Sequence, residues 1–319
     1  MKLIRIVGAG PNKRRFLSQS LVWLAMVPAA GGALAAPQQS AEHPAGVSPA
    51  QLAALAFPGW SDSAAGRVQT VTLPRLPGIS RKPRSAWSEG ARRVVAEPKL
   101  VIRVDATHLT LIAGLVPADE GSQRAVDHTT PMALAAYQFE QRNGAWKLAG
   151  RQGVFALRGF FGEASLRAVA LSSQRQAVAV EYGSCWQGYC GTWLALYELD
   201  KGVARQQPAL EMALSGINVD SNGDCVRRLQ PLIKPHPQEP RVDDDRTAPE
   251  SHDCYAVESN WTIEPARDLP GDFTIRYQGA ISRADAHALA PSAIDQRQVL
   301  RYSGGKYRAI SGFNPVPPI

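Results

Sequence analysis

The chain has 319 residues, of which 45% are hydrophobic and 20% are charged, and it carries a net charge of +7. Five of the seven net positive charges lie in residues 1–35, which contain no acidic residue, so the remaining chain carries only +2. Most of the net positive charge therefore lies in the N-terminal leader and does not indicate a nucleic-acid-binding protein. The length after the leader suffices to bury a core, in one large domain or two small ones.

The first 35 residues have the pattern of a bacterial signal peptide. An apolar run from Leu21 to Ala36 follows a basic segment and ends at Ala33-Leu34-Ala35, a small-x-small cleavage pattern. The run contains Pro28 and is shorter than the roughly 20 apolar residues that span a bilayer. We therefore expect cleavage, no transmembrane span afterwards, and a periplasmic or secreted protein. Residues 13–17 (KRRFL) also resemble a twin-arginine signal, and both that route and the Sec route stay open.

Four cysteines in an exported chain predict two disulfides, because the compartment is oxidising. Four cysteines allow three connectivities, and the sequence does not decide among them. We favour Cys185–Cys190 and Cys225–Cys254, because each pair is close along the chain and lies between strand-like segments.

Residues 36–98 are expected to form an N-terminal arm. Its first part, Ala36–Gly46, is rich in Ala, Pro, Gln and Ser and is predicted to be disordered. Ser48 followed by Pro49 is typical of a helix start, so a short helix is expected over residues 49–57, ended by Pro58-Gly59. From residue 68 to residue 98, Pro, Arg and Ser predominate, and we expect an extended segment.

From residue 99 to residue 319 the chain is predicted to be an antiparallel all-β domain. Short runs rich in β-branched and aromatic residues alternate with turn pairs such as Asn143-Gly144, Lys201-Gly202 and Gly304-Gly305. Only Met132–Phe139 is ambiguous between helix and strand. Several hairpins carry an aromatic residue before the turn, but at uneven spacing. This favours a sandwich, or else an irregular propeller-like β-domain, over a regular propeller.

The candidate binding site is the loop that Cys185 and Cys190 would close. A disulfide there would hold Trp186, Gln187 and Tyr189 at a hairpin tip. Rigid Trp and Tyr side chains provide large contact area at low entropic cost, as in the hot spots of protein interfaces. The alternative is a structural staple whose aromatic side chains fold back onto the core.

A candidate calcium loop follows at Asp220, Asn222 and Asp224. These alternating oxygen ligands resemble the start of an EF-hand loop. Cys225 stands in place of the sixth-position Gly and Pro231 in place of the twelfth-position Glu. The alternative is a polar turn with Asx hydrogen bonds, and no other cofactor is expected. The long connection that follows, Leu229–Asp253, contains five prolines and would be closed at its ends by the second disulfide.

No motif for a hydrolase triad, zinc protease, P-loop or dinucleotide site is present, and the catalytic residues of any enzyme stay unknown. The sequence resembles no family over enough of its length to name one. We expect an exported, non-catalytic β-domain that binds a protein partner in the bacterial envelope, of the inhibitor, immunity or assembly type. The alternative is a hydrolase of envelope polymers that uses two carboxylates across a cleft.

Overall fold

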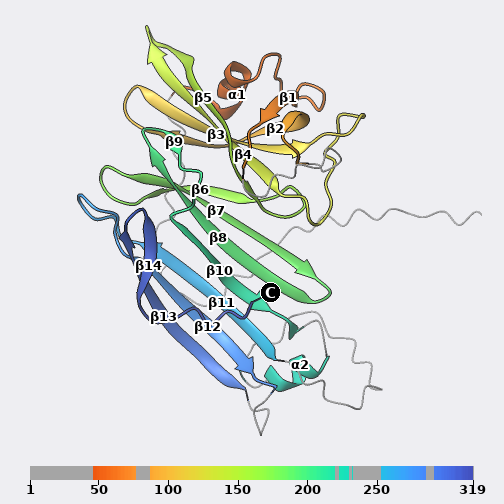
Figure 1. Cartoon of the computed structure of the whole chain (residues 1–319), viewed down its shortest axis with the longest axis vertical. Coiled ribbons are helices and arrows are strands. Elements are labelled where there is room, and N and C mark those ends of the chain that lie inside the picture. Colours follow the sequence, from red (N-terminus) through yellow and green to blue (C-terminus); the bar gives the residue numbers. More distant parts are fainter. Residues whose placement is uncertain are drawn as a thin grey trace, which may run out of the picture. The chain divides into compact units, whose positions relative to one another are not determined.

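The computed structural model describes residues 46–76, 87–219, 223–229, 232, 253–284 and 291–318. In this part the chain forms two antiparallel β-sheets and two short helices (Figure 1), which confirms the predicted all-β class. The signal peptide and the segment up to residue 45 lie outside the described residues. No helix in the described part is long and apolar enough to cross a bilayer.

The first sheet has five strands in sequence order, with a helix packed against it. Its elements are α1 (Pro49–Ala56), β1 (Val68–Leu73), β2 (Gly90–Arg103), β3 (His108–Pro117), β4 (Met132–Arg142) and β5 (Ala145–Arg158). Helix α1 begins with a capping box: the Ser48 hydroxyl accepts from the Gln51 N–H, and the Gln51 side chain accepts from the Ser48 N–H. Leu52 of this helix is fully buried in the core beneath the sheet.

The structure corrects the expectation of an extended arm, because residues 68–73 and 90–98 are strands of the first sheet. Strand β1 pairs with β2, and Val94 and Ala96 of β2 are fully buried, whereas Arg92 is half-buried and Arg93 is exposed. Pro98 is accommodated where the pairing of β2 with β3 shifts register. Because of the arginines and the proline, the sequence of β2 does not show the regular alternation that a half-buried strand would predict.

The second sheet has nine strands in the order β14-β13-β12-β11-β10-β8-β7-β6, with β9 paired to β8. It is curled in Figure 1. Its strands are β6 (Ser165–Ala170), β7 (Gln176–Trp186), β8 (Tyr189–Asp200), β9 (Val203–Ala204), β10 (Leu210–Ile217), β11 (Cys254–Ile263), β12 (Phe273–Ser282), β13 (Ser292–Ser303) and β14 (Lys306–Ser311). Helix α2 (Gly223–Leu229) contacts β11 and β12 at one end of the sheet.

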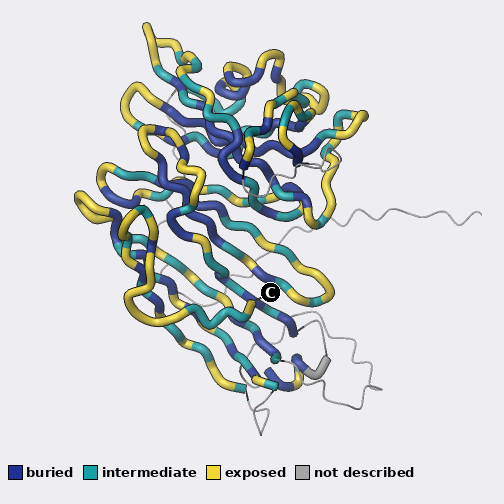
Figure 2. The backbone as a smooth tube through the Cα atoms, viewed as in Figure 1, coloured by how far each residue is buried: buried dark blue, intermediate teal, exposed yellow. Residues whose placement is uncertain are grey.

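The two sheets share one buried hydrophobic cluster. Met132 and Phe155 of the first sheet and Val178 and Tyr197 of the second belong to it, and the Phe155 and Tyr197 rings lie 5.3 Å apart. Residues 41–319 accordingly form one compact unit. Buried residues follow the middle of the strands and exposed residues the turns (Figure 2). The two sheets therefore pack against each other through a shared core.

The ambiguous segment Met132–Phe139 is part of strand β4. Its residues from Met132 to Ala136 are fully buried, because one side of β4 faces α1 and the other faces the second sheet. A strand buried on both sides has a continuous apolar run instead of an alternating one. The same run would also suit a buried helix, which explains the ambiguity.

Residues 312–318 cross the inner face of the curled sheet, defined here as the face that carries Leu194, Ile275 and Tyr277. After β14, Gly312 turns the chain at φ +67°, where a side chain would overlap the Arg297 carbonyl oxygen. The Asn314 side chain then donates a 2.9 Å hydrogen bond to the Ala213 carbonyl of β10, and the Val316 side chain packs against the inner-face cluster. This tail therefore covers apolar surface that the sheet alone would expose.

Buried tyrosines predict a loss of stability at alkaline pH. Burial raises the pKa of Tyr137 to about 12 and raises the pKa of Tyr277 as well, whereas an unfolded chain ionises tyrosine near pH 10. Above about pH 10 the unfolded state therefore binds fewer protons than the folded state, so the free energy of unfolding falls as pH rises. We expect a melting temperature that declines from about pH 10 upward, together with tyrosinate absorbance.

The replacement Tyr277→Phe should reduce this decline, because it removes a buried hydroxyl that ionises more readily in the unfolded chain. The change should cost little stability at neutral pH, since that hydroxyl makes a hydrogen bond of 3.4 Å, to Gln298. The exposed Tyr189→Phe serves as the control and should leave the decline unchanged. Equal pH profiles for all three proteins would contradict the assignment of the effect to buried tyrosine.

Candidate functional site: an aromatic surface at the stapled hairpin

Strands β7 and β8 form a hairpin whose tip is closed by a disulfide. The two turn residues, Gln187 and Gly188, have φ values of 51° and 82°, as in a type I′ turn. Cys185 and Cys190 lie directly opposite each other one residue before the turn-flanking pair, and they form a disulfide. The tip is therefore held both by the turn and by a covalent bond.

The aromatic side chains of this tip face solvent instead of folding onto the core. Trp186 is 56% exposed and Tyr189 is 40% exposed, and they stand directly opposite each other on the same side of the hairpin. The Trp186 ring stacks on the His128 imidazole, with centroids 4.3 Å apart and planes inclined by 13°. Exposed large aromatic side chains that are also held in place are typical of binding surfaces.

A tight turn of the first sheet presents His128. The Asp127 carboxylate accepts hydrogen bonds from the Thr129 hydroxyl, the Thr130 hydroxyl and the Thr129 N–H, each 2.8 Å long. These bonds favour the charged form and lower the pKa of Asp127. The Trp87 indole donates a 2.9 Å hydrogen bond to the Pro131 carbonyl just beyond the turn. The position of His128 is thus set by the turn.

The connection between β5 and β6 contributes Phe161, which is 48% exposed and whose ring centroid lies 6.3 Å from that of His128. Phe161 itself has φ +53°, and Gly162 follows at φ +68°, where a side chain would overlap Val116. Arg124 fixes the loop: its guanidinium donates a 2.8 Å hydrogen bond to the Gly162 carbonyl and forms an ion pair with Glu163.

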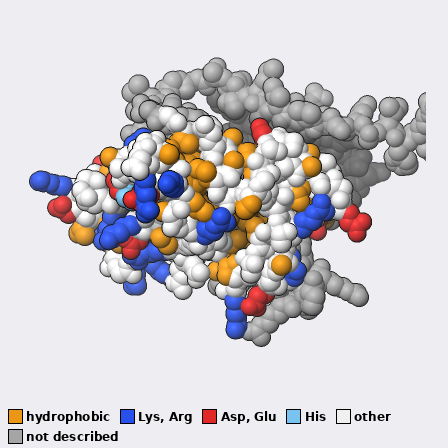
Figure 3. Space-filling model, turned by 90° about the horizontal axis from the view of Figure 1, so that it is seen from above, with side chains coloured by type: hydrophobic (Ala, Val, Ile, Leu, Met, Phe, Trp, Pro, Cys, Tyr) orange, Lys and Arg blue, Asp and Glu red, His pale blue; other side chains and the backbone are white. Residues whose placement is uncertain are grey.

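A row of partly buried aromatic rings continues from Trp186 and Tyr189 along the same face of the hairpin. The Phe160, Tyr182 and Trp193 centroids lie 5.6–6.2 Å from one another. Burial raises the pKa of Tyr182 to about 12, so its hydroxyl is neutral at physiological pH. We call the exposed Phe161, Trp186 and Tyr189 and the half-buried His128, together with this row, the aromatic surface. On the face drawn in Figure 3, by comparison, hydrophobic side chains are interspersed with charged and uncharged ones.

Beside the aromatic surface, strand β7 has an open edge. Strand β6 pairs with β7 only from Gln176 to Glu181, so the stretch from Tyr182 to Trp186 has β8 as its only paired neighbour in the described structure. In a two-residue hairpin, the residues that flank the turn exchange both backbone hydrogen bonds and the next pair does not. The N–H and C=O groups of Gly183 and Cys185 therefore point away from β8, and both residues are exposed.

The remaining predicted site residues lie apart from this surface. Asp220 and Asn222 of the candidate calcium loop lie outside the described residues, and Asp224 lies in α2, with a side chain that is also outside them. The second expected disulfide, Cys225–Cys254, is present and fully buried where α2 meets β11. Most of the connection from Leu229 to Asp253 lies outside the described residues.

The described carboxylates bear on the hydrolase alternative. A glycosidase-type general acid needs a raised pKa, whereas every described carboxylate with a shifted pKa has it lowered, as at Asp105 and Asp272, by hydrogen bonds. Among the described carboxylates only Glu198 is buried, and it is bound by the Tyr302 hydroxyl at 2.5 Å and Arg175 at 3.0 Å. This pairing serves to join β8 and β13.

The sequence identified the hairpin tip but missed the partners of Trp186. His128 and Phe161 lie in loops of the other sheet, far away along the chain, and neither loop carries a motif that would link it to the hairpin. The two disulfides are consistent with an oxidising environment outside the cytoplasm. No protein-family model matches the chain, and neither the curated proteins nor the solved structures include a significantly similar one.

Proposed function

We propose that this protein is an exported, non-catalytic β-domain that binds a protein partner in the periplasm or outside the cell. The observation that carries the proposal is the aromatic surface, where Trp186, Phe161 and Tyr189 are each at least 40% exposed. Soluble proteins seldom expose several large aromatic side chains together unless they bind something there. Trp and Tyr are also the residues most enriched in the hot spots of protein interfaces.

Rigidity supports the proposal, since binding is weakened by any side chain or loop that has to be ordered. The disulfide Cys185–Cys190 fixes the hairpin tip, stacking on His128 fixes Trp186, and Arg124 fixes the Phe161 loop. The hairpin tip, the His128 turn and the Phe161 loop are thus each held by contacts of their own, and Trp186 joins the first to the second. A partner would therefore meet a surface that is already ordered.

The open edge of β7 suggests how a partner could be oriented. The unpaired N–H and C=O groups of Gly183 and Cys185 could bind one extended segment of the partner as an added strand. Side chains on one side of that segment would then contact Trp186 and Phe160. Main-chain bonds would supply orientation and the aromatic side chains most of the affinity.

Site-specific photo-cross-linking in the exporting cell tests this function. A photoreactive amino acid replaces Gln187 at the hairpin tip in one variant and the exposed Gln141 at the end of β4 in the control. We expect one defined protein adduct from position 187 and none from position 141. Equal adducts from both positions, or no adduct from position 187, would refute a protein-binding role for this surface.

A further inference from the structure

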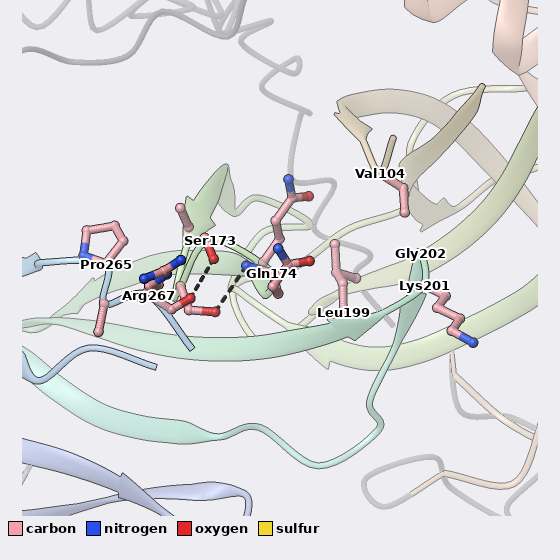
Figure 4. A pocket seen from close by; sticks show the side chains of 12 residues that line it. Val104, Ser173, Gln174, Leu199, Lys201, Gly202, Pro265 and Arg267 are labelled. Carbon is pink, nitrogen blue, oxygen red and sulfur yellow. Dashed lines mark hydrogen bonds between the residues drawn. The ribbon is translucent and has the colours of Figure 1, made fainter. Parts of the chain in front are cut away.

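A cleft of about 690 Å³ lies away from the aromatic surface, where three turns of the second sheet meet Val104 at the end of β2. The turn between β6 and β7 contributes Ser173 and Gln174, the turn between β8 and β9 contributes Lys201, and the loop before β12 contributes Arg267. Figure 4 places Arg267 beside Ser173 at one end of the cleft and Lys201 at the other, with Gln174 and Leu199 between them. The Lys201 side chain extends outward from this end, with its ammonium directed away from Leu199. Its volume is within the usual range for small-molecule sites.

The turns that form this cleft are fastened to each other. The Ser173 N–H and hydroxyl donate hydrogen bonds to the carbonyls of Ala266 and Arg267, and the Gly271 N–H donates one of 2.8 Å to the Leu171 carbonyl. At the other end, the Thr110 hydroxyl donates a 3.0 Å hydrogen bond to the Gly202 carbonyl. The cleft is therefore formed before any ligand binds, which reduces the cost of binding.

The charges of the cleft are positive and uncompensated within it. The Arg267 guanidinium and the Lys201 ammonium make no ion pair or hydrogen bond with any described residue. Asp200, Glu264 and Asp268 adjoin them along the chain, but none of the three lines the cleft. Between the two cations the wall is uncharged and partly apolar, with Leu199 and Val104 on it. An anionic group at one end would meet Arg267, and an aliphatic body would meet the middle. The flexible Lys201 side chain would turn inward to meet an anionic group at the other end.

We propose that this cleft binds an elongated small molecule of the α,ω-dicarboxylate type. One carboxylate lies on Arg267, whose planar guanidinium suits a bidentate contact, and the other lies on Lys201. The body of the ligand runs along Leu199 and Val104, with the Gln174 amide available for a polar substituent. The cleft shares no residue with the aromatic surface, so this site does not depend on the proposed protein-binding function.

A length series of dicarboxylates tests the proposal by calorimetry on the whole exported protein. The probes run from succinate to dodecanedioate, each beside the monocarboxylate of the same length, with inorganic phosphate as a further probe. We expect one length to bind about tenfold more tightly than its monocarboxylate, because only the dianion reaches both cations. The single variants Arg267→Gln and Lys201→Gln should each remove this advantage.

The control is Arg297→Gln, which removes the same charge from an exposed arginine on β13 that does not line the cleft. It should keep the preference for the dicarboxylate, and unchanged circular dichroism should show that all three variants fold. The proposal is overturned if monocarboxylate and dicarboxylate bind equally at every length, if nothing binds, or if phosphate binds as tightly. Equal losses in the control and in the cleft variants would likewise overturn it.

Discussion

Replacing Trp186 and Tyr189 together with alanine should weaken binding of the cross-linked partner by about 100-fold or more. Both side chains are exposed at the tip of a disulfide-closed hairpin, so they can be contacted without any rearrangement of the fold. Truncation of an aromatic hot-spot residue costs about 2–4 kcal/mol of binding free energy. The affinity of the purified partner for the wild-type and the double-variant protein, measured by calorimetry, provides the test.

A matched control is Phe313→Ala, which removes a 62% exposed aromatic side chain from the tail that follows β14. This variant should bind the partner as the wild type does. Neither change should lower the melting temperature by more than a degree or two, since surface substitutions away from buried features alter stability little. If the double variant bound within about twofold of the wild type, the hairpin would be a structural staple and the proposed contact surface would be wrong.

Replacing Cys225 and Cys254 with serine should lower the free energy of unfolding by about 3.5 kcal/mol. The two cysteines are separated by 29 residues and are fully buried, and their disulfide holds α2 against β11. Without it, the unfolded chain gains the freedom that closure of that loop had removed. For a protein of this size the melting temperature should fall by about 10 °C. Urea denaturation monitored by tryptophan fluorescence gives both quantities.

The hairpin disulfide should contribute less to stability and more to binding. It closes a loop with a sequence separation of only 5, so the change Cys185→Ser with Cys190→Ser should cost about 2 kcal/mol of stability. The loosened tip should nevertheless bind the partner markedly less well, because Trp186 and Tyr189 would have to be ordered on binding. A larger stability loss from the hairpin pair than from the Cys225–Cys254 pair would contradict this division of roles.

Local signals in the sequence were sufficient to predict several elements. Ser48 before Pro49 predicted the start of α1, and the pairs Asn143-Gly144 and Gly304-Gly305 predicted hairpin turns that the structure contains. These signals succeed because a cap or a turn with positive φ depends on two or three neighbouring residues. The class of the domain followed from such turns and from the β-branched runs between them.

Features that depend on distant contacts were not predictable in the same way. The sequence of β2 predicts an extended arm, because its arginines and Pro98 interrupt the apolar pattern to which the buried Val94 and Ala96 belong. The aromatic surface was only half predicted, since the neighbours of Trp186 come from turns of the other sheet. Nothing in a single sequence pairs His128 with Trp186, because no local pattern encodes which faces of two sheets will meet.

The tail across the inner face of the curled sheet also orders the events of folding. The hydrogen bond from Asn314 to the Ala213 carbonyl joins positions 101 residues apart, and Val316 completes the burial of the inner-face cluster. Full burial of the inner-face cluster therefore requires a segment that lies much later in the chain than β10. Until that segment is in place this surface stays open to water, and contacts of such large sequence separation form slowly.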